Sequence, residues 1–277
     1  MFATPQKLIA SVLVIGSIFL SSAAMAAPKS ELWEKWATHD AASTMTVDHS
    51  IWNKFLQTYL KNDPDGLNKL DYAGVSAADK KALDSYIGLL TATPVLKLNQ
   101  MEQQPFWINL YNALTVQVVL DHFPVKSIRD IDISPGLFSS GPWGKKLVEI
   151  DGEQISLDDI EHRILRPIWK DPRIHYAVNC ASVGCPDLSA KAYTADTTDA
   201  MLGENAVAYI NSPRGVKLDG SDVIVSSIYD WFQEDFGGSE KGVIAHLLKY
   251  AQGDRKAALE KASKISDYDY DWALNGL

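Results

Sequence analysis

Cysteine, long apolar runs and clusters of positive charge are all scarce in this 277-residue chain. Its two cysteines, Cys180 and Cys185, cannot complete a structural zinc site by themselves, because such a site takes four ligands. The formal net charge is −9, and no run of Lys or Arg stands out. Nucleic-acid phosphates and anionic lipids both require a basic protein surface. We therefore expect neither a nucleic acid nor an anionic lipid surface as partner.

The apolar run at the N-terminus is too short to cross a membrane. It comprises the 13 residues from Leu8 to Leu20, whereas a spanning helix needs roughly 20. Lys7 precedes the run and small residues follow it as far as Ala26, which is the order of a secretory signal. We expect residues 1–26 to be a signal peptide cleaved after Ala26, so that the mature protein is periplasmic or secreted and has no membrane span. The alternative, an uncleaved anchor, is disfavoured by the length of the run.

The remaining chain is expected to form one domain. Cleavage leaves 277 − 26 = 251 residues, enough for a sizeable core. It contains no internal repeat, low-complexity segment or long flexible linker. We therefore predict a single domain over residues 27–277 with a helical N-terminal portion.

Apolar periodicity predicts helices first and hairpins later. Helical stripes cover 51–60, 77–90 and 100–122, and the last is apolar on most faces, as expected of a central, buried helix. Asp-Gly pairs predict hairpins at 146–155 and 216–225. Further segments are predicted as a short helix capped by Ser156 and Asp159, an alternating strand at 173–178, and helices at 196–210, 239–251 and 254–263. The order predicts an α+β fold, with N-terminal helices and the central helix packed on a small mixed or antiparallel sheet with hairpins.

The central helix carries polar side chains that an apolar helix does not need. Asn109 and Asn112 are three residues apart and share one face. Buried amides must be hydrogen-bonded, and from inside a helix they reach outward. They therefore either hold a neighbouring loop or bind a ligand, for instance as oxyanion donors. Glu102, one turn before the aromatic pair, is a candidate to orient a histidine or an arginine.

A second polar group surrounds Cys180. A thiol nucleophile needs a base, a third group that orients the base, and donors for the oxyanion. His175 and His162 are the candidate bases, and Glu161 or Glu102 the candidate orienter. On an extended strand, His175 and Cys180 would face opposite ways about 16 Å apart, so His162 is an equally good base. The alternatives are a Cys180–Cys185 disulfide, favoured in an oxidising compartment, or two reduced, inert cysteines.

Several other features have both a structural and a functional interpretation. Arg173 is suited to binding a substrate carboxylate or to neutralising Glu161 or Glu102. No H-x-x-E-H or H-E-x-x-H spacing is present, so we expect no metal and no other cofactor. The aromatic and acidic runs at 229–232 and 268–272 indicate packing segments first, and a groove for a sugar or peptide second.

These motifs together resemble the DUF547 family, a domain defined by sequence. The stretches that carry the resemblance are FWINLYNA at 106–113, LDDIEH at 157–162, DPRIHYA at 171–177, the segments 180–186, 226–231 and 235–236, and YDWALN at 270–275. They run through the chain in order from about residue 45 to the C-terminus. The family also occurs in intracellular plant proteins, where a permanent disulfide is not expected, so the resemblance keeps a free thiol at Cys180 open beside the disulfide.

Three functions of different class remain open. The set of Glu, Asn, His, Arg and Cys is similar to that of papain-like or transglutaminase-like thiol hydrolases, by analogy of residue types. The first hypothesis is thus a cysteine-dependent hydrolase or acyltransferase on peptide or amide bonds, with a fold of that kind. The second is a non-catalytic module that binds a peptide, glycan or small ligand, with a Cys180–Cys185 disulfide as a clip. A third is a structural partner in an envelope complex.

Overall fold

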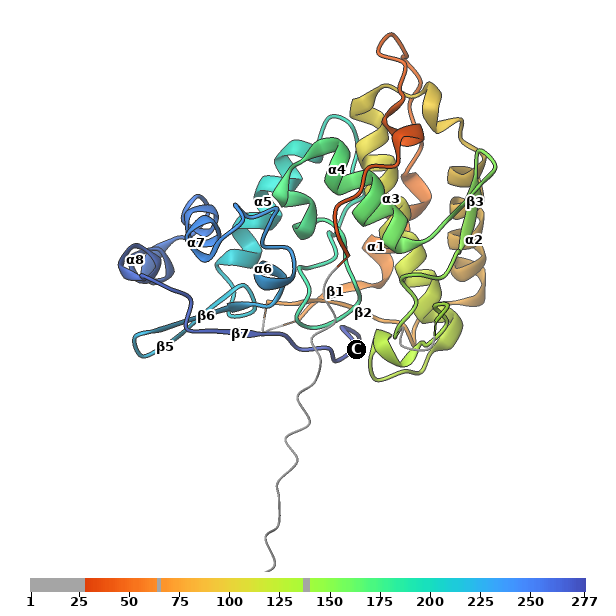
Figure 1. The fold of residues 1–277 in the computed structure, drawn as a ribbon. Coiled ribbons are helices and arrows are strands. Elements are labelled where there is room, and N and C mark those ends of the chain that lie inside the picture. Colours follow the sequence, from red (N-terminus) through yellow and green to blue (C-terminus); the bar gives the residue numbers. More distant parts are fainter. Residues whose placement is uncertain (1–27, 64–65, 137–139) are drawn as a thin grey trace, which may run out of the picture.

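The computed structural model describes residues 28–63, 66–136 and 140–277 (Figure 1). The predicted signal peptide and its cleavage site after Ala26 lie outside these residues. Within the described part of the chain, no helix is both long enough and apolar enough to cross a bilayer.

The N-terminal portion is helical, as predicted. A single 3-10 turn, η1 (Glu34–Ala37), precedes three helices, α1 (Ser50–Tyr59), α2 (Ala77–Ala92) and α3 (Gln100–His122). The side chains of Ser76 and Asn99 cap α2 and α3 by accepting hydrogen bonds from backbone N–H groups of the first turn. Of the 23 residues of α3, 16 are buried, so this helix is the centre of the larger core, as its apolar composition predicted.

The strands of the described part of the chain form three small sheets. Hairpin β1 (Leu60–Asn62) and β2 (Asn68–Leu70) follows α1, and hairpin β3 (Val148–Ile150) and β4 (Glu153–Ile155) turns at Asp151-Gly152. The third sheet is mixed: β5 (Val216–Asp219) and β6 (Asp222–Ser226) are antiparallel, and β7 (Asp267–Asp269) lies parallel to β6. Both predicted hairpins are therefore confirmed, and the fold is α+β.

Short helices connect these parts. They are η2 (Val95–Lys97), η3 (Ile128–Asp130), η4 (Asp159–Leu165), α4 (Arg166–Trp169), η5 (Pro172–Tyr176), α5 (Thr198–Ile210), α6 (Ile228–Trp231), α7 (Glu240–Leu248) and α8 (Gly253–Lys261). Ser156 and Asp159 cap the segment before η4 reciprocally: Ser156 Oγ accepts from Asp159 N at 3.2 Å, and Asp159 Oδ2 accepts from Ser156 N at 2.9 Å. The predicted capping box is confirmed, although η4 itself is a π-helical segment, a form that often occurs at functional sites.

The predicted strand at 173–178 is wrong. Residues Pro172–Tyr176 form the 3-10 helix η5. Asp171 caps it by accepting a hydrogen bond from Arg173 N at 2.9 Å, and Pro172 supplies a first residue with its φ already fixed. The capping pair Asp-Pro decides the conformation here, and the alternation of apolar residues that follows it is incidental.

The molecule has two hydrophobic clusters joined by its C-terminal segment. The larger cluster gathers around α1, α2 and α3, and the smaller one around α5, α7, α8 and the β5–β6–β7 sheet, on the opposite side of Figure 1. After β7 the chain returns toward the larger cluster, where Gly276 bridges Leu70 of β2. On the way it pairs with residues 182–184 through Val183 N to Ala273 O and Gly184 N to Asp271 O, both 2.8 Å. This segment therefore fixes the loop that carries both cysteines.

Candidate functional site

The loop from Cys180 to Cys185 is held in place by backbone and amide hydrogen bonds. Asn179 donates from Nδ2 to Pro186 O, and its Oδ1 accepts from Ala181 N, both at 2.8 Å. Ala181 adopts a left-handed conformation with φ of +57°, which turns the chain sharply after Cys180. These contacts bring the two cysteines, five positions apart, to the same point.

Four side chains form the thiol cluster: Cys180, Ser182, Cys185 and Tyr270. The sulfur of Cys180 lies 3.0 Å from that of Cys185, 3.1 Å from Ser182 Oγ and 2.9 Å from the Tyr270 hydroxyl. Both cysteines are free thiols in this structure; Cys185 is buried and Cys180 half-buried. The disulfide inferred from the sequence remains a prediction, and the sulfurs are already adjacent.

The surroundings shift the pKa values of the two thiols in opposite directions. The hydrogen-bond contact with Cys185 lowers the pKa of Cys180, and the contacts with Ser182 and Tyr270 add to this, although burial and the charge of Glu161 oppose it. Burial raises the pKa of Cys185 well above its usual range. Cys180 is therefore the more acidic and the more accessible thiol, which is the condition for a nucleophile.

The histidine predicted to activate Cys180 has other partners. His175 Nε2 lies 2.7 Å from Asp235 Oδ2, and its Nδ1 lies 3.5 Å from Glu161 Oε1. Burial alone would lower the pKa of His175, but the hydrogen bonds and charges of Asp235 and Glu161 outweigh it and raise that pKa. Both ring nitrogens of His175 thus face carboxylates and neither faces the Cys180 thiol, so this histidine is not placed to accept a proton from it.

His162, the other candidate base, belongs to the same group as His175. Its Nδ1 lies 3.1 Å from Arg166 Nη1, and its Nε2 faces Asp158 Oδ1 at 3.7 Å. Burial lowers the pKa of His162 to about 4, so it is neutral at pH 7. In the described part of the chain, all six histidines are present and none hydrogen-bonds to Cys180.

The ionic partners extend into a buried cluster of five residues, called here the charged cluster: Glu161, His162, Arg166, His175 and Asp235. Arg166 Nε donates to Asp235 Oδ2 at 2.6 Å, and the Arg166 side chain is 2% exposed. Burial would raise the pKa of Glu161 and of Asp235, yet the neighbouring positive charges lower both to about 2. Since η4, α4 and η5 supply four members and the segment after α6 supplies Asp235, the cluster links the two hydrophobic clusters.

The polar residues of the central helix hold loops. Asn109 donates to Tyr193 O at 2.8 Å and accepts from Tyr193 N at 3.0 Å. Asn112 donates to Ala177 O and accepts from Asn179 N, both at 2.8 Å. Of the two interpretations left open by the sequence, these contacts support the loop anchor. Asn112 nevertheless serves the site, because it fixes the residue before Cys180.

Glu102 lies at the start of α3, apart from the histidines of the charged cluster. Its Oε2 accepts a hydrogen bond from Val47 N at 3.3 Å, and its own N–H donates to the capping side chain of Asn99. Burial raises the pKa of Glu102. These contacts give Glu102 a role in joining the N-terminal segment to α3.

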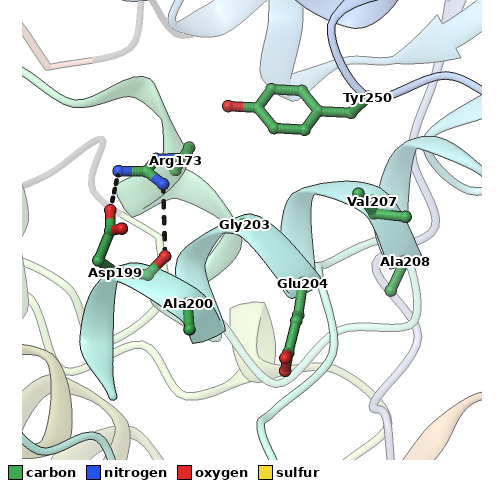
Figure 2. Close-up of a pocket in the computed structure, with 8 residues that line it drawn as sticks. All are labelled: Arg173, Asp199, Ala200, Gly203, Glu204, Val207, Ala208 and Tyr250. Atoms are coloured by element: carbon green, nitrogen blue, oxygen red, sulfur yellow. Dashed lines mark hydrogen bonds and ion pairs between the residues drawn. The ribbon is translucent and has the colours of Figure 1, made fainter. Parts of the chain in front are cut away.

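Arg173 lies at a shallow surface pocket of about 590 Å³ on α5 (Figure 2). It pairs with Asp171 and with Asp199 at 2.7 Å each, where the sequence had suggested Glu161 or Glu102. The ring of Tyr250 lies across the pocket from Arg173, and Glu204 points away from both (Figure 2). Asp199 occupies the guanidinium face that a substrate carboxylate would use.

Four aromatic rings form one contacting group that includes Tyr270 of the thiol cluster: Trp143, Trp231, Tyr270 and Trp272. Their centroids lie 4.7–5.9 Å apart in the contacting pairs, and all four side chains are half-buried. The guanidinium of Arg129 stacks on Trp272 at 5.2 Å. Tyr270 belongs to this aromatic surface and also to the thiol cluster, so it connects the two.

The sequence reasoning missed three partners. Tyr270 was considered only as part of an aromatic run and of a family motif, Asp235 only as part of a family motif, and Arg166 not at all. A signal existed for Arg166: it follows His162 by four residues, which puts the two side chains on the same face of a helix. Tyr270 lies 90 residues from Cys180 along the chain, and no local pattern connects them.

Comparison with known proteins identifies the central part of the chain. Residues 95–210 match the family DUF547, described as "Protein of unknown function, DUF547". Over this region the chain belongs to the DUF547 family. No protein with a curated description and no solved structure matches the chain. The DUF547 match covers α3, the cysteine loop and every member of the charged cluster except Asp235; the papain-like or transglutaminase-like fold stays a prediction.

Proposed function

We propose that this chain is an exported enzyme that uses the Cys180 thiol as its nucleophile. Three hydrogen-bonding groups around one half-buried sulfur support the proposal: Cys185, Ser182 and Tyr270. Hydrogen bonds to an ionised acceptor favour the ionised form. A thiolate at Cys180 is thus stabilised without the help of a histidine.

The same geometry bears on the reaction class. A papain-like hydrolase would form its thiolate by proton transfer to a histidine, but His175 already donates to two carboxylates. The arrangement favours attack by a thiolate that exists before the substrate binds. Hydrolysis or acyl transfer at peptide or amide bonds then requires a leaving group protonated by a neighbouring hydroxyl, and Tyr270, kept neutral by burial, is the nearest such group.

Alkylation of Cys180 tests the nucleophile. We expect iodoacetamide to label Cys180 of the reduced native protein faster than an ordinary exposed thiol-containing peptide at pH 7, with the site assigned by mass spectrometry and abolished in Cys180→Ser. Tyr270→Phe removes one donor worth about 1.5–3 kcal/mol to a charged acceptor, so the thiolate fraction falls by more than about ten-fold. A thiolate of higher pKa is also the better nucleophile, which offsets about half of this effect on a logarithmic scale, so we expect a labelling rate about three- to ten-fold lower.

Tyr268→Phe is the matched control for Tyr270→Phe, because Tyr268 lies two residues earlier in β7 and its hydroxyl does not contact Cys180. Equal rates in Tyr270→Phe and Tyr268→Phe would remove the hydrogen-bond argument. A native Cys180 that labels more slowly than the peptide would exclude the nucleophile.

The second candidate function is ligand binding by the aromatic surface. Half-buried tryptophans with exposed edges suit the faces of sugar rings and the aromatic side chains of peptides. Binding that survives Cys180→Ser and is lost in Trp272→Ala, measured by tryptophan fluorescence with glycan and peptide libraries, would favour this function over catalysis.

Export is proposed from the N-terminal segment alone. Lys7, the apolar run and the small residues before Ala27 support it. Mass spectrometry of the protein from a fractionated bacterial culture is expected to give a mature chain that begins at Ala27. An intact N-terminus in the cytoplasmic fraction would refute it.

A further inference from the structure

The two sulfurs of the cysteine loop face each other at 3.0 Å while both are thiols. The backbone N–H of Cys180 also donates to the Cys185 sulfur at 3.0 Å, so the second thiol is aimed at the first by the loop itself. A chance neighbour would not be held in this way. This geometry is that of two thiols placed to form a disulfide with each other.

Cys180 and Cys185 differ in solvent exposure, and this difference suits them to two different steps of a reaction. Cys180 is half-buried and is reachable from solvent, whereas Cys185 is 3% exposed. A cysteine that attacks an external disulfide must be accessible, and a cysteine that resolves the resulting mixed disulfide needs only to reach its neighbour. The acidities agree with this division, since the pKa of Cys180 is lowered by hydrogen bonds and that of Cys185 is raised by burial.

The surrounding backbone keeps the loop ordered in the reduced state. Asn275 N donates to Ala181 O at 2.9 Å, and Gly184 N donates to Asp271 O at 2.8 Å. A Cβ on Gly184 would come within 2.7 Å of Asp271 N, so glycine is required for this close approach. Because these contacts do not depend on a sulfur–sulfur bond, oxidation and reduction can both occur without unfolding the loop.

We infer that Cys180 and Cys185 form a thiol–disulfide exchange pair, in which Cys180 attacks a disulfide of a peptide or small molecule and Cys185 resolves the intermediate. This inference rests on the proposed nucleophilic role of Cys180 and gives it a substrate class. It requires no histidine, which agrees with the engagement of His175 and His162 in the charged cluster.

The reaction balances with the substrate disulfide as oxidant. The Cys180 thiolate attacks one sulfur of R–S–S–R′, a bond forms between Cys180 and that sulfur, and R′–S⁻ leaves and takes up a proton. The Cys185 thiol then loses its proton as its sulfur attacks the Cys180 sulfur, the Cys180–Cys185 bond forms, and R–S⁻ leaves and takes up that proton. Two protein thiols are oxidised to one disulfide, and one substrate disulfide is reduced to two thiols.

Trapping the mixed disulfide tests the inference. The full-length chain is reduced, freed of reductant and mixed with oxidised glutathione, and its mass is measured under denaturing, acid-quenched conditions. We expect wild type to end as the internal disulfide without adduct, Cys185→Ser to keep one glutathione on Cys180 in about ten-fold more molecules than wild type, and Cys180→Ser to carry neither.

The outcomes separate this inference from the proposed function. If iodoacetamide labels Cys180 rapidly but Cys185→Ser forms no adduct, exchange is refuted and the nucleophile stands. If Cys180 is not labelled at all, the proposed function itself fails. An adduct that persists equally in wild type refutes Cys185 as the resolving thiol, and a wild-type disulfide that dithiothreitol cannot reduce in the native protein makes the pair a permanent clip.

Folding of the variant is controlled in the same experiment. Cys185→Ala is made beside Cys185→Ser, because alanine places no hydroxyl in the buried position, and urea unfolding is measured for both. Adduct on either cooperatively folded variant supports the exchange pair, and absence of adduct on a folded variant refutes it.

Discussion

The charged cluster and the thiol cluster lie five residues apart in the sequence, at His175 and Cys180, yet their polar groups are stabilised in different ways. In the charged cluster, buried charges are neutralised by opposite charges at 2.6–2.7 Å. In the thiol cluster, a sulfur is surrounded by uncharged hydroxyl and thiol groups at 2.9–3.1 Å. Full pairing makes the first cluster rigid and unreactive. In the second, a sulfur is surrounded by groups that favour its ionisation without carrying an opposite charge, and this cluster is the candidate for chemistry.

Removing Asp235 is expected to have the largest effect on stability. Asp235→Ala leaves Arg166 and His175 buried without their shared partner, and breaking a buried pair by removal of one member costs about 3–5 kcal/mol. We expect a loss of this size in the free energy of unfolding, measured by urea titration at pH 7. The rate at which iodoacetamide labels Cys180 in the folded protein is expected to stay the same.

Glu234→Gln is the control for that substitution. Glu234 also pairs with Arg166, at 3.0 Å, but its side chain is 60% exposed, so we expect a loss of about 0–1 kcal/mol. Equal losses for the two variants would show that the charged cluster does not link the two hydrophobic clusters as described.

Substitutions of Asn112 and Asn109 give a second test, because they distinguish a residue that supports the thiol cluster from one that anchors another loop. Each is buried and makes two hydrogen bonds to backbone, so Ala at either position is expected to cost about 2–4 kcal/mol of unfolding free energy. Only Asn112→Ala frees the backbone on both sides of Val178 and thereby loosens the residue before Cys180. We expect it, and not Asn109→Ala, to change the labelling rate of Cys180. A change of similar size in both variants would contradict this assignment.

The smallest expected effect is the change with pH in the contribution of His175 to the free energy of unfolding. Its folded pKa lies above the unfolded value of about 6.5. Its contribution to stability is therefore complete below about pH 6.5 and is lost as the pH rises through the folded pKa. We expect His175→Gln to destabilise the protein more at pH 6 than at pH 9, measured by urea unfolding at both. The opposite order would mean that His175 is neutral in the folded protein.

The pKa values of His162 and His175 are shifted in opposite directions from the usual value, and an NMR titration of labelled histidine can show this. His162, with a pKa of about 4, binds its proton only below pH 5, whereas His175 stays protonated above pH 6.5. His162 therefore stabilises the fold above about pH 6.5 and loses this contribution as the pH falls toward 4.

The elements with strong local signals were predictable from the sequence. The helix at 100–122 has apolar residues on most faces, and the hairpins have Asp-Gly at their turns, so periodicity and turn chemistry alone define them. Ser156 and Asp159 form a capping box because both partners lie within four residues. The strand predicted at 173–178 failed because Asp171-Pro172 imposes a helical start that alternation does not reveal.

The candidate site was predictable in its residue types and not in its pairing. Cys180, Cys185, His175, His162 and Glu161 were all identified, but the sequence suggested that either His175 or His162 would serve Cys180. The observed partners, Asp235 and Tyr270, lie 60 and 90 residues away along the chain. Such contacts depend on how the C-terminal third packs on the centre, and spacing does not encode that.

The pairing of residues 271–276 with the cysteine loop and with β2 has a consequence for biosynthesis. The backbone partners of Val183, Gly184 and Ala181 are synthesised, and cross a membrane if the chain is exported, only after α5, α7, α8 and the whole third sheet. The thiol loop therefore cannot assume its final form until residues 271–275 have been delivered. A chain that stops before them would present both cysteines in an unorganised segment, so the acidity and pairing of these thiols depend on residues 271–275.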